Sequence, residues 1–135
     1  MKRILFILLF CVSLSFAQVQ TETAGVLTAA STDCTDVSSC VTITQLPANV
    51  KSVVFTTQGV FTADARFEGT YDGIRWAPLW ATPLGAASDL ARKPVNGALT
   101  SGGAWTFGAT GLRGVRVRCN ALYSGAAQVE IRAFQ

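Results

Sequence analysis

The stretch FTADARFEGTYDGIRWAPLW, residues 61–80, decides the predicted fold. Its first half alternates, with Phe61, Ala63, Ala65 and Phe67 separated by charged or hydroxyl side chains. A period of two is typical of a β-strand that has one buried face and one solvated face. The stretch therefore predicts a strand that forms part of the wall of an all-β domain.

The Asp72-Gly73 pair in the same stretch predicts a two-residue hairpin turn, because such turns need positive φ angles. Closing the hairpin there pairs Phe67 with Pro78 and Ala65 with Trp80. This register places four more side chains on the buried face with Phe61 and Phe67, namely Ile74, Trp76, Pro78 and Trp80. Since proline cannot donate a ladder hydrogen bond, the second strand is predicted to lie at a sheet edge.

Outward from this hairpin, other segments carry the same alternation or β-branched runs. Short strands are expected at residues 26–30, 41–44, 50–57, 105–108, 115–121 and 127–133. Between residues 83 and 103 no period is sustained, which indicates either a surface loop or a short helix at 87–93 with flanking loops. Seven or eight short strands predict an antiparallel β-sandwich or jelly roll.

The last two strands are predicted to form a second hairpin through Tyr123-Ser124-Gly125, in which glycine supplies the left-handed position. That register places Val117 opposite Ile131 and Cys119 opposite Val129 on the buried face. Arg118 then lies opposite Glu130 on the solvated face.

The N-terminus, MKRILFILLFCVSLSFAQ, has the pattern of a secretory signal peptide: a short basic region, an apolar run and a small-x-small site. An uncleaved membrane anchor is the alternative. The predicted organisation is a signal peptide over residues 1–17, a flexible leader over 18–25 and one β-sandwich domain over 26–135. The protein is then secreted, at the cell surface or on a virion, without contact to a membrane once the signal is removed.

Charge and composition exclude several classes of function. The chain has 11 basic and 8 acidic residues, and two of the basic ones are removed with the signal peptide, so the net charge of the remainder is +1. This is too small an excess of positive charge to indicate binding to nucleic acid. With no histidine, imidazole-based triads and His-ligated metals are excluded, and no cofactor motif is present. Asp64, Glu68 and Asp72 are interpreted as solvated strand and turn residues, so no enzymatic activity is expected.

Three cysteines follow the signal peptide. Cys34 and Cys40 are close enough to close a small loop by a disulfide, as is common in exported proteins. Cys119 is in phase with the buried residues Val115 and Val117, which favours a buried free thiol. Pairing of Cys119 with one of the other two, or with another chain, remains open.

Binding candidates are the aromatic and arginine side chains outside the predicted core. Tyr71 and Tyr123 are expected at hairpin tips, where aromatic rings can contact a sugar or a protein. Arg113, Arg116 and Arg118 could form a positive strip, although such strips are often solvated faces paired with acids such as Glu130. Trp76 and Trp80 are assigned to the core.

Two segments, FEGTYDGIRWAPL and TGLRGVRVRCNALYSGAAQVEIRA, resemble a β-sandwich module of phage and prophage virion-associated proteins. The shared features are an Asp-Gly–x-Trp hairpin, a Gly-Leu–x–x-Val-Arg-Val strand and a Ser-Gly connection, within residues 50–135. Galactose-binding-like jelly rolls have a similar pattern. The signal peptide departs from a virion protein assembled in the cytoplasm and indicates a cell-encoded exported relative or a role at a cell surface.

The resemblance implies a non-enzymatic module that assembles with copies of itself or decorates a larger scaffold. The alternative is a secreted carbohydrate-binding module that attaches to surface glycans. Both are expectations that the sequence alone does not decide between.

Overall fold

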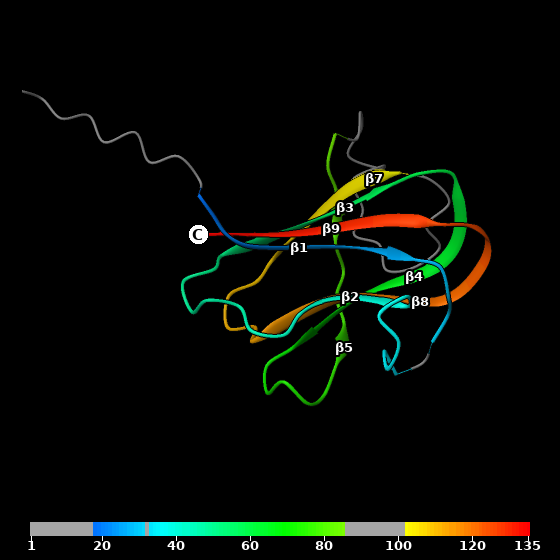
Figure 1. The fold of residues 1–135 in the computed structure, drawn as a ribbon. Helices are drawn as coiled ribbons and strands as arrows, with labels where there is room; N and C mark the ends of the chain where they lie inside the picture. Colours follow the sequence, from blue (N-terminus) through cyan, green and yellow to red (C-terminus); the bar gives the residue numbers. More distant parts are fainter. Residues whose placement is uncertain (1–17, 32, 86–101) are drawn as a thin grey trace, which may run out of the picture.

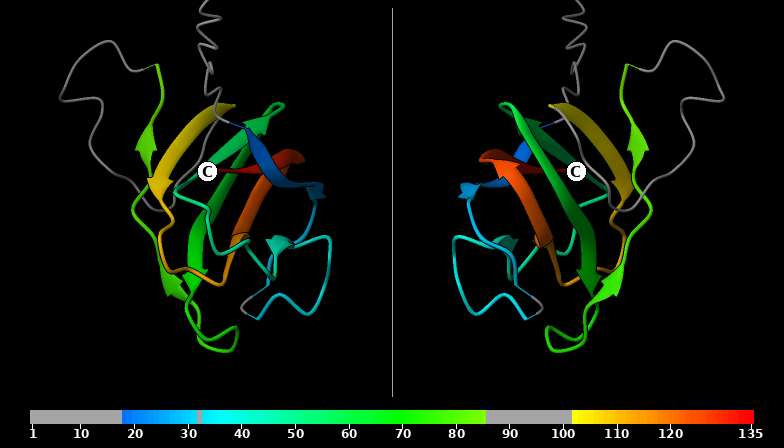
Figure 2. Two further views of the ribbon diagram at one scale, coloured as in Figure 1. Left: turned by 90° about the vertical axis from the view of Figure 1, so that its left-hand side faces the viewer. Right: turned by 90° about the vertical axis from the view of Figure 1, so that its right-hand side faces the viewer.

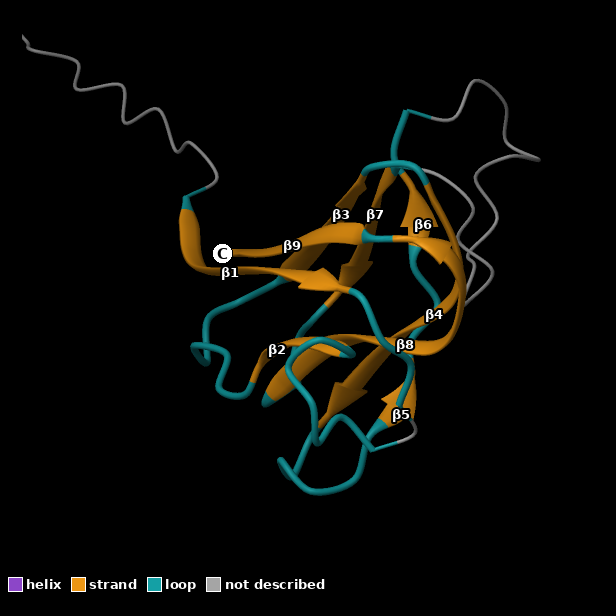
Figure 3. Cartoon of the chain, turned by 45° about the vertical axis from the view of Figure 1, so that its right-hand side comes forward, coloured by secondary structure: helices purple, strands orange, loops and turns teal. Residues whose placement is uncertain are grey.

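The computed structural model describes residues 18–31, 33–85 and 102–135, and for Tyr123 the backbone alone. The expected signal peptide lies outside these ranges, as does most of the 83–103 segment with the helix considered at 87–93. Within the described ranges every regular element is a β-strand (Figure 3). A helix long and apolar enough to cross a membrane is not found there.

The strands form two antiparallel sheets, which lie one above the other in Figure 1. In spatial order, the five-stranded sheet contains β1 (Val19–Leu27), β9 (Ala127–Phe134), β3 (Ser52–Gln58), β7 (Gly103–Gly108) and β6 (Thr82–Pro83). The four-stranded sheet contains β2 (Cys40–Ile43), β8 (Gly114–Gly125), β4 (Phe61–Thr70) and β5 (Ala77–Pro78). The prediction of an all-β, antiparallel, two-layered fold is confirmed.

The core lies between the two sheets and is organised around stacked phenylalanines. Phe55 of β3 stacks on Phe67 of β4 with ring centroids 4.6 Å apart, and on Phe107 of β7 at 5.2 Å. Because β3 and β4 belong to different sheets, this stack joins the two layers. The alternating buried residues of β4 and β9 complete the core as their sequence period predicts.

Strand β1 begins at Val19 and therefore includes most of the segment predicted to be a flexible leader. It pairs along its length with β9, for example Thr23 with Ile131 and Leu27 with Ala127. The leader prediction over residues 18–25 is wrong. The segment carries only a weak period, and its pairing with β9, which is far away in sequence, is a non-local contact that the local pattern does not report.

The β4–β5 pairing differs from the predicted hairpin by one residue. Pro78 pairs with Glu68 instead of Phe67, and the Leu79 amide donates to the Phe67 carbonyl at 2.8 Å. A shift of one residue exchanges the two faces of a strand, so Leu79 packs against the core. The predicted core residues Ile74, Pro78 and Trp80 are instead exposed, and Trp76 is half-buried on the outer face. The expected edge position of β5 is confirmed.

Strands β8 and β9 do not pair with each other, so the predicted second hairpin is wrong. Strand β8 pairs with β4 and β2, whereas β9 pairs with β1 and β3 in the other sheet. Gly125, at φ 75°, and Ala126 carry the chain from one sheet to the other. Alternation correctly predicted which β8 and β9 side chains are buried, but it does not identify the neighbouring strand. Tyr123 consequently lies within β8 and not at a hairpin tip.

The cysteines adopt one of the expected arrangements. Cys34 and Cys40 form a disulfide with their Cα atoms 5.4 Å apart; Cys40 begins β2, and Cys34 lies in the loop that precedes it. Cys119 is a buried free thiol on the inner face of β8. Desolvation raises the pKa of this thiol, with a smaller contribution from the nearby Asp64 carboxylate.

Candidate functional site

A buried charged cluster lies on the outer face of the four-stranded sheet, where the sequence predicts solvated residues. Glu68 on β4 lies directly opposite Arg116 on β8, and Arg118 follows two residues along β8. Glu68 accepts from Arg116 Nε at 2.6 Å and from Arg118 Nε and Nη2 at 3.0 and 2.8 Å. All three side chains are buried. One carboxylate thus joins two guanidinium groups.

The environment of Glu68 keeps its carboxyl group ionised. Burial alone would raise the pKa of Glu68, but hydrogen bonds from Arg118 and Arg116 and the charges of both guanidiniums outweigh it. The pKa is therefore lowered. Among the described residues, every buried side-chain nitrogen and oxygen has a hydrogen-bond partner, so the cluster is internally satisfied.

Two loops cover this cluster and are connected by it. Arg118 donates from Nη1 to the Ser31 carbonyl at 3.0 Å, which ties the segment before β2 to the sheet. The guanidinium of Arg116 lies over the Trp76 ring, 4.3 Å from its centroid, which ties the β4–β5 loop to the same sheet. Because both arginines bind Glu68, the position of each loop depends on this carboxylate.

The β4–β5 loop, residues 70–76, is organised by Asp72. Its Oδ1 accepts from the amides of Ile74 and Arg75, both at 2.8 Å, and from the Thr70 hydroxyl at 3.0 Å. Its Oδ2 accepts from Arg75 Nε at 2.9 Å. The pKa of Asp72 is lowered mainly by the hydrogen bond from the Arg75 amide and next by the one from the Ile74 amide. These bonds produce a wide Asx-type turn instead of the predicted two-residue hairpin turn.

Replacing Asp72 with Ala is expected to accelerate hydrogen exchange at the Ile74 and Arg75 amides, because both lose their acceptor. Asp72→Asn keeps Oδ1 and should preserve most of the protection. Amide exchange followed by NMR measures both variants. Equal protection in Asp72→Ala and the wild type would contradict the role given to this carboxylate.

The ordered loop presents a set of side chains to solvent at one end of the molecule. Tyr71 is 73% exposed and Ile74 81% exposed. The exposed Arg113 lies beside them and donates from Nη1 to the Asp72 carbonyl at 3.3 Å. Binding surfaces are often rich in large apolar side chains and arginine. Here the hydrogen bonds of the loop hold the backbone that carries them in one conformation before any partner binds.

The segment before β2 presents a second surface. Asp33 and Asp36 are exposed, and between them and the disulfide partner Cys40 lies Val37, which is 88% exposed. Asp33 accepts from the Ser31 hydroxyl at 2.8 Å, and Asp36 accepts from the Ser38 amide at 2.8 Å. These bonds are the leading causes that lower the pKa of each aspartate, so both carry a negative charge at neutral pH.

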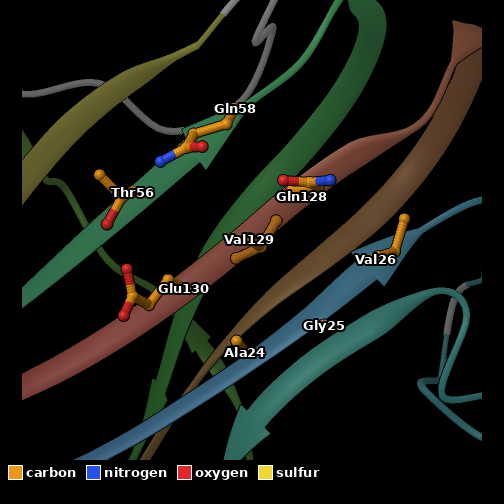
Figure 4. Close-up of a pocket in the computed structure, with 8 residues that line it drawn as sticks. All are labelled: Ala24, Gly25, Val26, Thr56, Gln58, Gln128, Val129 and Glu130. Atoms are coloured by element: carbon orange, nitrogen blue, oxygen red, sulfur yellow. The ribbon is translucent and has the colours of Figure 1, made fainter.

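A shallow groove of about 430 Å³ lies on the other sheet, across β1, β9 and β3 (Figure 4). Its lining is mostly small or uncharged, with Glu130 as the charged member: Ala24, Gly25, Val26, Thr56, Gln58, Gln128, Val129 and Glu130. No aromatic ring belongs to this described lining. Glu130 is engaged by Arg132, whose Nη2 lies 2.6 Å from Oε1. The groove gives no indication of a specific ligand chemistry.

The structure places the five binding candidates predicted from sequence in different environments. Tyr71 and Arg113 lie together at the end of the molecule formed by the β4–β5 loop. Arg116 and Arg118 do not form a solvated strip, because both are buried against Glu68. Tyr123 is in β8, and its side chain lies outside the description.

Sequence reasoning missed three residues that build this site: Glu68, Asp72 as a loop organiser, and Trp76. The Arg-x-Arg spacing of Arg116 and Arg118 signalled that both face the same side of a strand. The spacing does not show that this face of the sheet is buried, because the segments that bury it are distant in sequence. Asp72 was visible as a turn residue, although not as the acceptor of four hydrogen bonds.

No protein-family model matches this chain, and no curated protein matches it in sequence. Among solved structures, the chain is similar to the SPBc2 prophage-derived protein YomS, with a TM-score of 0.62 and 13% sequence identity. The alignment covers 92% of this chain and 99% of YomS. At this identity the likeness concerns the fold, which the two proteins share over nearly their whole lengths.

Proposed function

We propose that the protein is a non-enzymatic module, exported or virion-associated, that assembles with copies of itself or decorates a larger surface structure. The observation that carries this proposal is the exposure of large apolar side chains, Val37, Tyr71 and Ile74, on loops held in place by hydrogen bonds, a disulfide and the Glu68 cluster. Exposed apolar residues on rigid supports favour contact with another macromolecule.

Two further observations support the proposal. The fold is shared with a prophage-derived protein, which favours a phage-associated origin. The titratable residues considered for catalysis have structural roles: Glu68 binds two arginines, Asp72 organises a loop, and Asp64 accepts from Asn120 Nδ2 at 3.0 Å. Export to a cell surface is supported by the N-terminal signal pattern, whereas association with a virion is supported by the fold shared with the prophage-derived protein.

Light scattering coupled to size exclusion, with negative-stain microscopy of the same peak, tests the assembly function. The full chain, expressed for export and purified in oxidised form, is expected to form a defined oligomer whose population rises with concentration. A strictly monomeric protein at high concentration would contradict self-assembly.

A carbohydrate-binding module is the second candidate, and the exposed Trp80 favours it. Trp80 is 66% exposed and lies just beyond Pro78, the last residue of the edge strand β5. Trp76 lies over Arg116 and Trp105 is partly buried, so Trp80 is the ring best placed to stack on a sugar. Glycan-dependent quenching of tryptophan fluorescence that disappears in Trp80→Ala would support this function. A flat response across a broad glycan panel would remove it.

A further inference from the structure

Two loops of opposite charge lie at the same end of the molecule. We define the acidic loop as residues 33–39 and the basic loop as residues 70–76 together with Arg113. Both reach the lower part of the two views in Figure 2, the acidic loop in cyan and residues 70–76 of the basic loop in green. The Glu68 cluster fixes their placement, because Arg118 holds Ser31 beside the acidic loop and Arg116 holds Trp76 of the basic loop.

The charged groups of these loops are available at the surface. In the described residues, neither Asp33 nor Asp36 forms an ion pair with a basic side chain, and Arg113 is bonded to a backbone carbonyl and not to a carboxylate. Arg75 pairs with Asp72, but its side chain remains 90% exposed. The exposed apolar residues are divided in the same way, with Val37 on the acidic loop and Tyr71 and Ile74 on the basic loop.

We propose that a second copy of this chain is the partner, with the acidic loop of each copy docked against the basic loop of the other. The inference rests on the proposed assembly function and specifies its contact. Since both loops lie at the same end of the folded molecule, a two-fold axis between the copies satisfies both contacts at once and closes the dimer. Each contact brings Asp33 and Asp36 towards Arg113 and Arg75, and Val37 towards Tyr71 and Ile74.

Charge complementarity favours a second copy over other occupants. A partner that bound the basic loop alone would leave the exposed acids beside it unmatched, and a partner for the acidic loop alone would leave the arginines unmatched. A copy of the chain brings an acidic loop to the basic loop and a basic loop to the acidic loop. Opposite charges aligned in this way also set the orientation of the two copies and disfavour other arrangements.

Charge reversal with mixing tests this contact. Asp36→Arg and Arg113→Glu are each expected to weaken self-association at least tenfold, because each creates like-charge contacts at both halves of the two-fold interface. An equimolar mixture of the two variants is expected to form a heterodimer, since both of its contacts again join opposite charges. Light scattering measures each variant alone and the mixture over a concentration series.

Controls separate a lost contact from a lost fold. Lys51→Glu makes the same charge change as Arg113→Glu at an exposed position outside both loops and should associate as the wild type does. Asp36→Asn keeps the oxygen that accepts from Ser38, and Arg113→Gln removes charge without reversing it, so these milder variants should give intermediate weakening. Thermal unfolding checks that every variant is folded.

Three outcomes would overturn the inference. A wild-type oligomer that persists in both reversed variants places the contact elsewhere and leaves the assembly function intact. A monomeric wild type ends the inference together with self-assembly. A monomer that binds heparin, used as a polyanion probe, and loses this binding in Arg113→Glu would assign the basic loop to an anionic glycan.

Discussion

Glu68→Gln is expected to lower the free energy of unfolding by about 3–5 kcal/mol, the range for removing one partner of a buried ion pair. The amide can still accept hydrogen bonds, but it leaves Arg116 and Arg118 buried without a counter-charge. The loss exceeds the value of a surface pair because the two guanidiniums cannot recover their hydration without opening the loops above them. Urea unfolding followed by tryptophan fluorescence measures the change.

Glu22→Gln is the matched control. Glu22 lies 3.6 Å from Arg132 on the outer face of the other sheet, and its side chain is 62% exposed. An exposed pair of this kind contributes about 0–1 kcal/mol, so the control should be nearly as stable as the wild type. If the two variants lost similar, small amounts of stability, the Glu68 cluster would not have the role that its burial indicates.

The stability lost in Glu68→Gln should also depend on pH. Because the pKa of Glu68 is lowered on folding, its stabilisation is fully present above the unfolded value, near 4.5, and is lost as pH falls through the lower folded pKa. The wild type should therefore lose stability on acidification below about pH 4.5 more steeply than Glu68→Gln. The difference between the two proteins should narrow as pH falls, and a constant difference would argue against an ionised Glu68 as its source.

The burial pattern of the strands could be predicted from the sequence, whereas their pairing could not. Alternation correctly assigned Phe61 and Phe67 on β4, Val117 on β8 and Ile131 on β9 to the buried face. The same period arises whichever strand lies alongside, so it could not show that β8 and β9 belong to different sheets. In the β4–β5 pair, the hydrogen bonds of Asp72 shifted the register by one residue, and this exposed Trp80.

The candidate site was predictable where it depends on local sequence. Tyr71 adjoins the Asp72-Gly73 turn and is exposed as the sequence predicts, whereas its position beside Arg113 was not predicted, because the sequence groups Arg113 with Arg116 and Arg118. The Glu68 cluster was not predictable, because a strand residue on the outer face is solvated unless something covers it. Its cover consists of Trp76 and the segment at Ser31, which tertiary contacts bring over the sheet. Burial of a charged residue is in this case a non-local property.

Gly125→Ala is the second substitution for which a large loss is expected, about 2–5 kcal/mol or failure to fold. Gly125 has φ 75°, where an L-residue other than glycine is strained by roughly 1–2 kcal/mol. An added Cβ would lie 2.2 Å from the Val60 carbonyl oxygen and 3.0 Å from the Phe61 Cα. Both are backbone atoms of the neighbouring β3–β4 corner, so no side-chain rotation relieves the clash, and displacing them adds the cost of overpacking.

Gly85→Ala separates the two contributions. Gly85 has the same φ of 75°, but an added Cβ there meets no atom of the described residues within 4 Å. It should lose only the backbone term of about 1–2 kcal/mol, and the excess in Gly125→Ala then measures the clash between the two corners. Thermal and urea unfolding of both variants give this difference. Gly59 and Gly125 lie in two neighbouring corners where the chain passes from one sheet to the other. If Gly125→Ala lost no more free energy of unfolding than Gly85→Ala, the two corners would be able to separate without unfolding the domain.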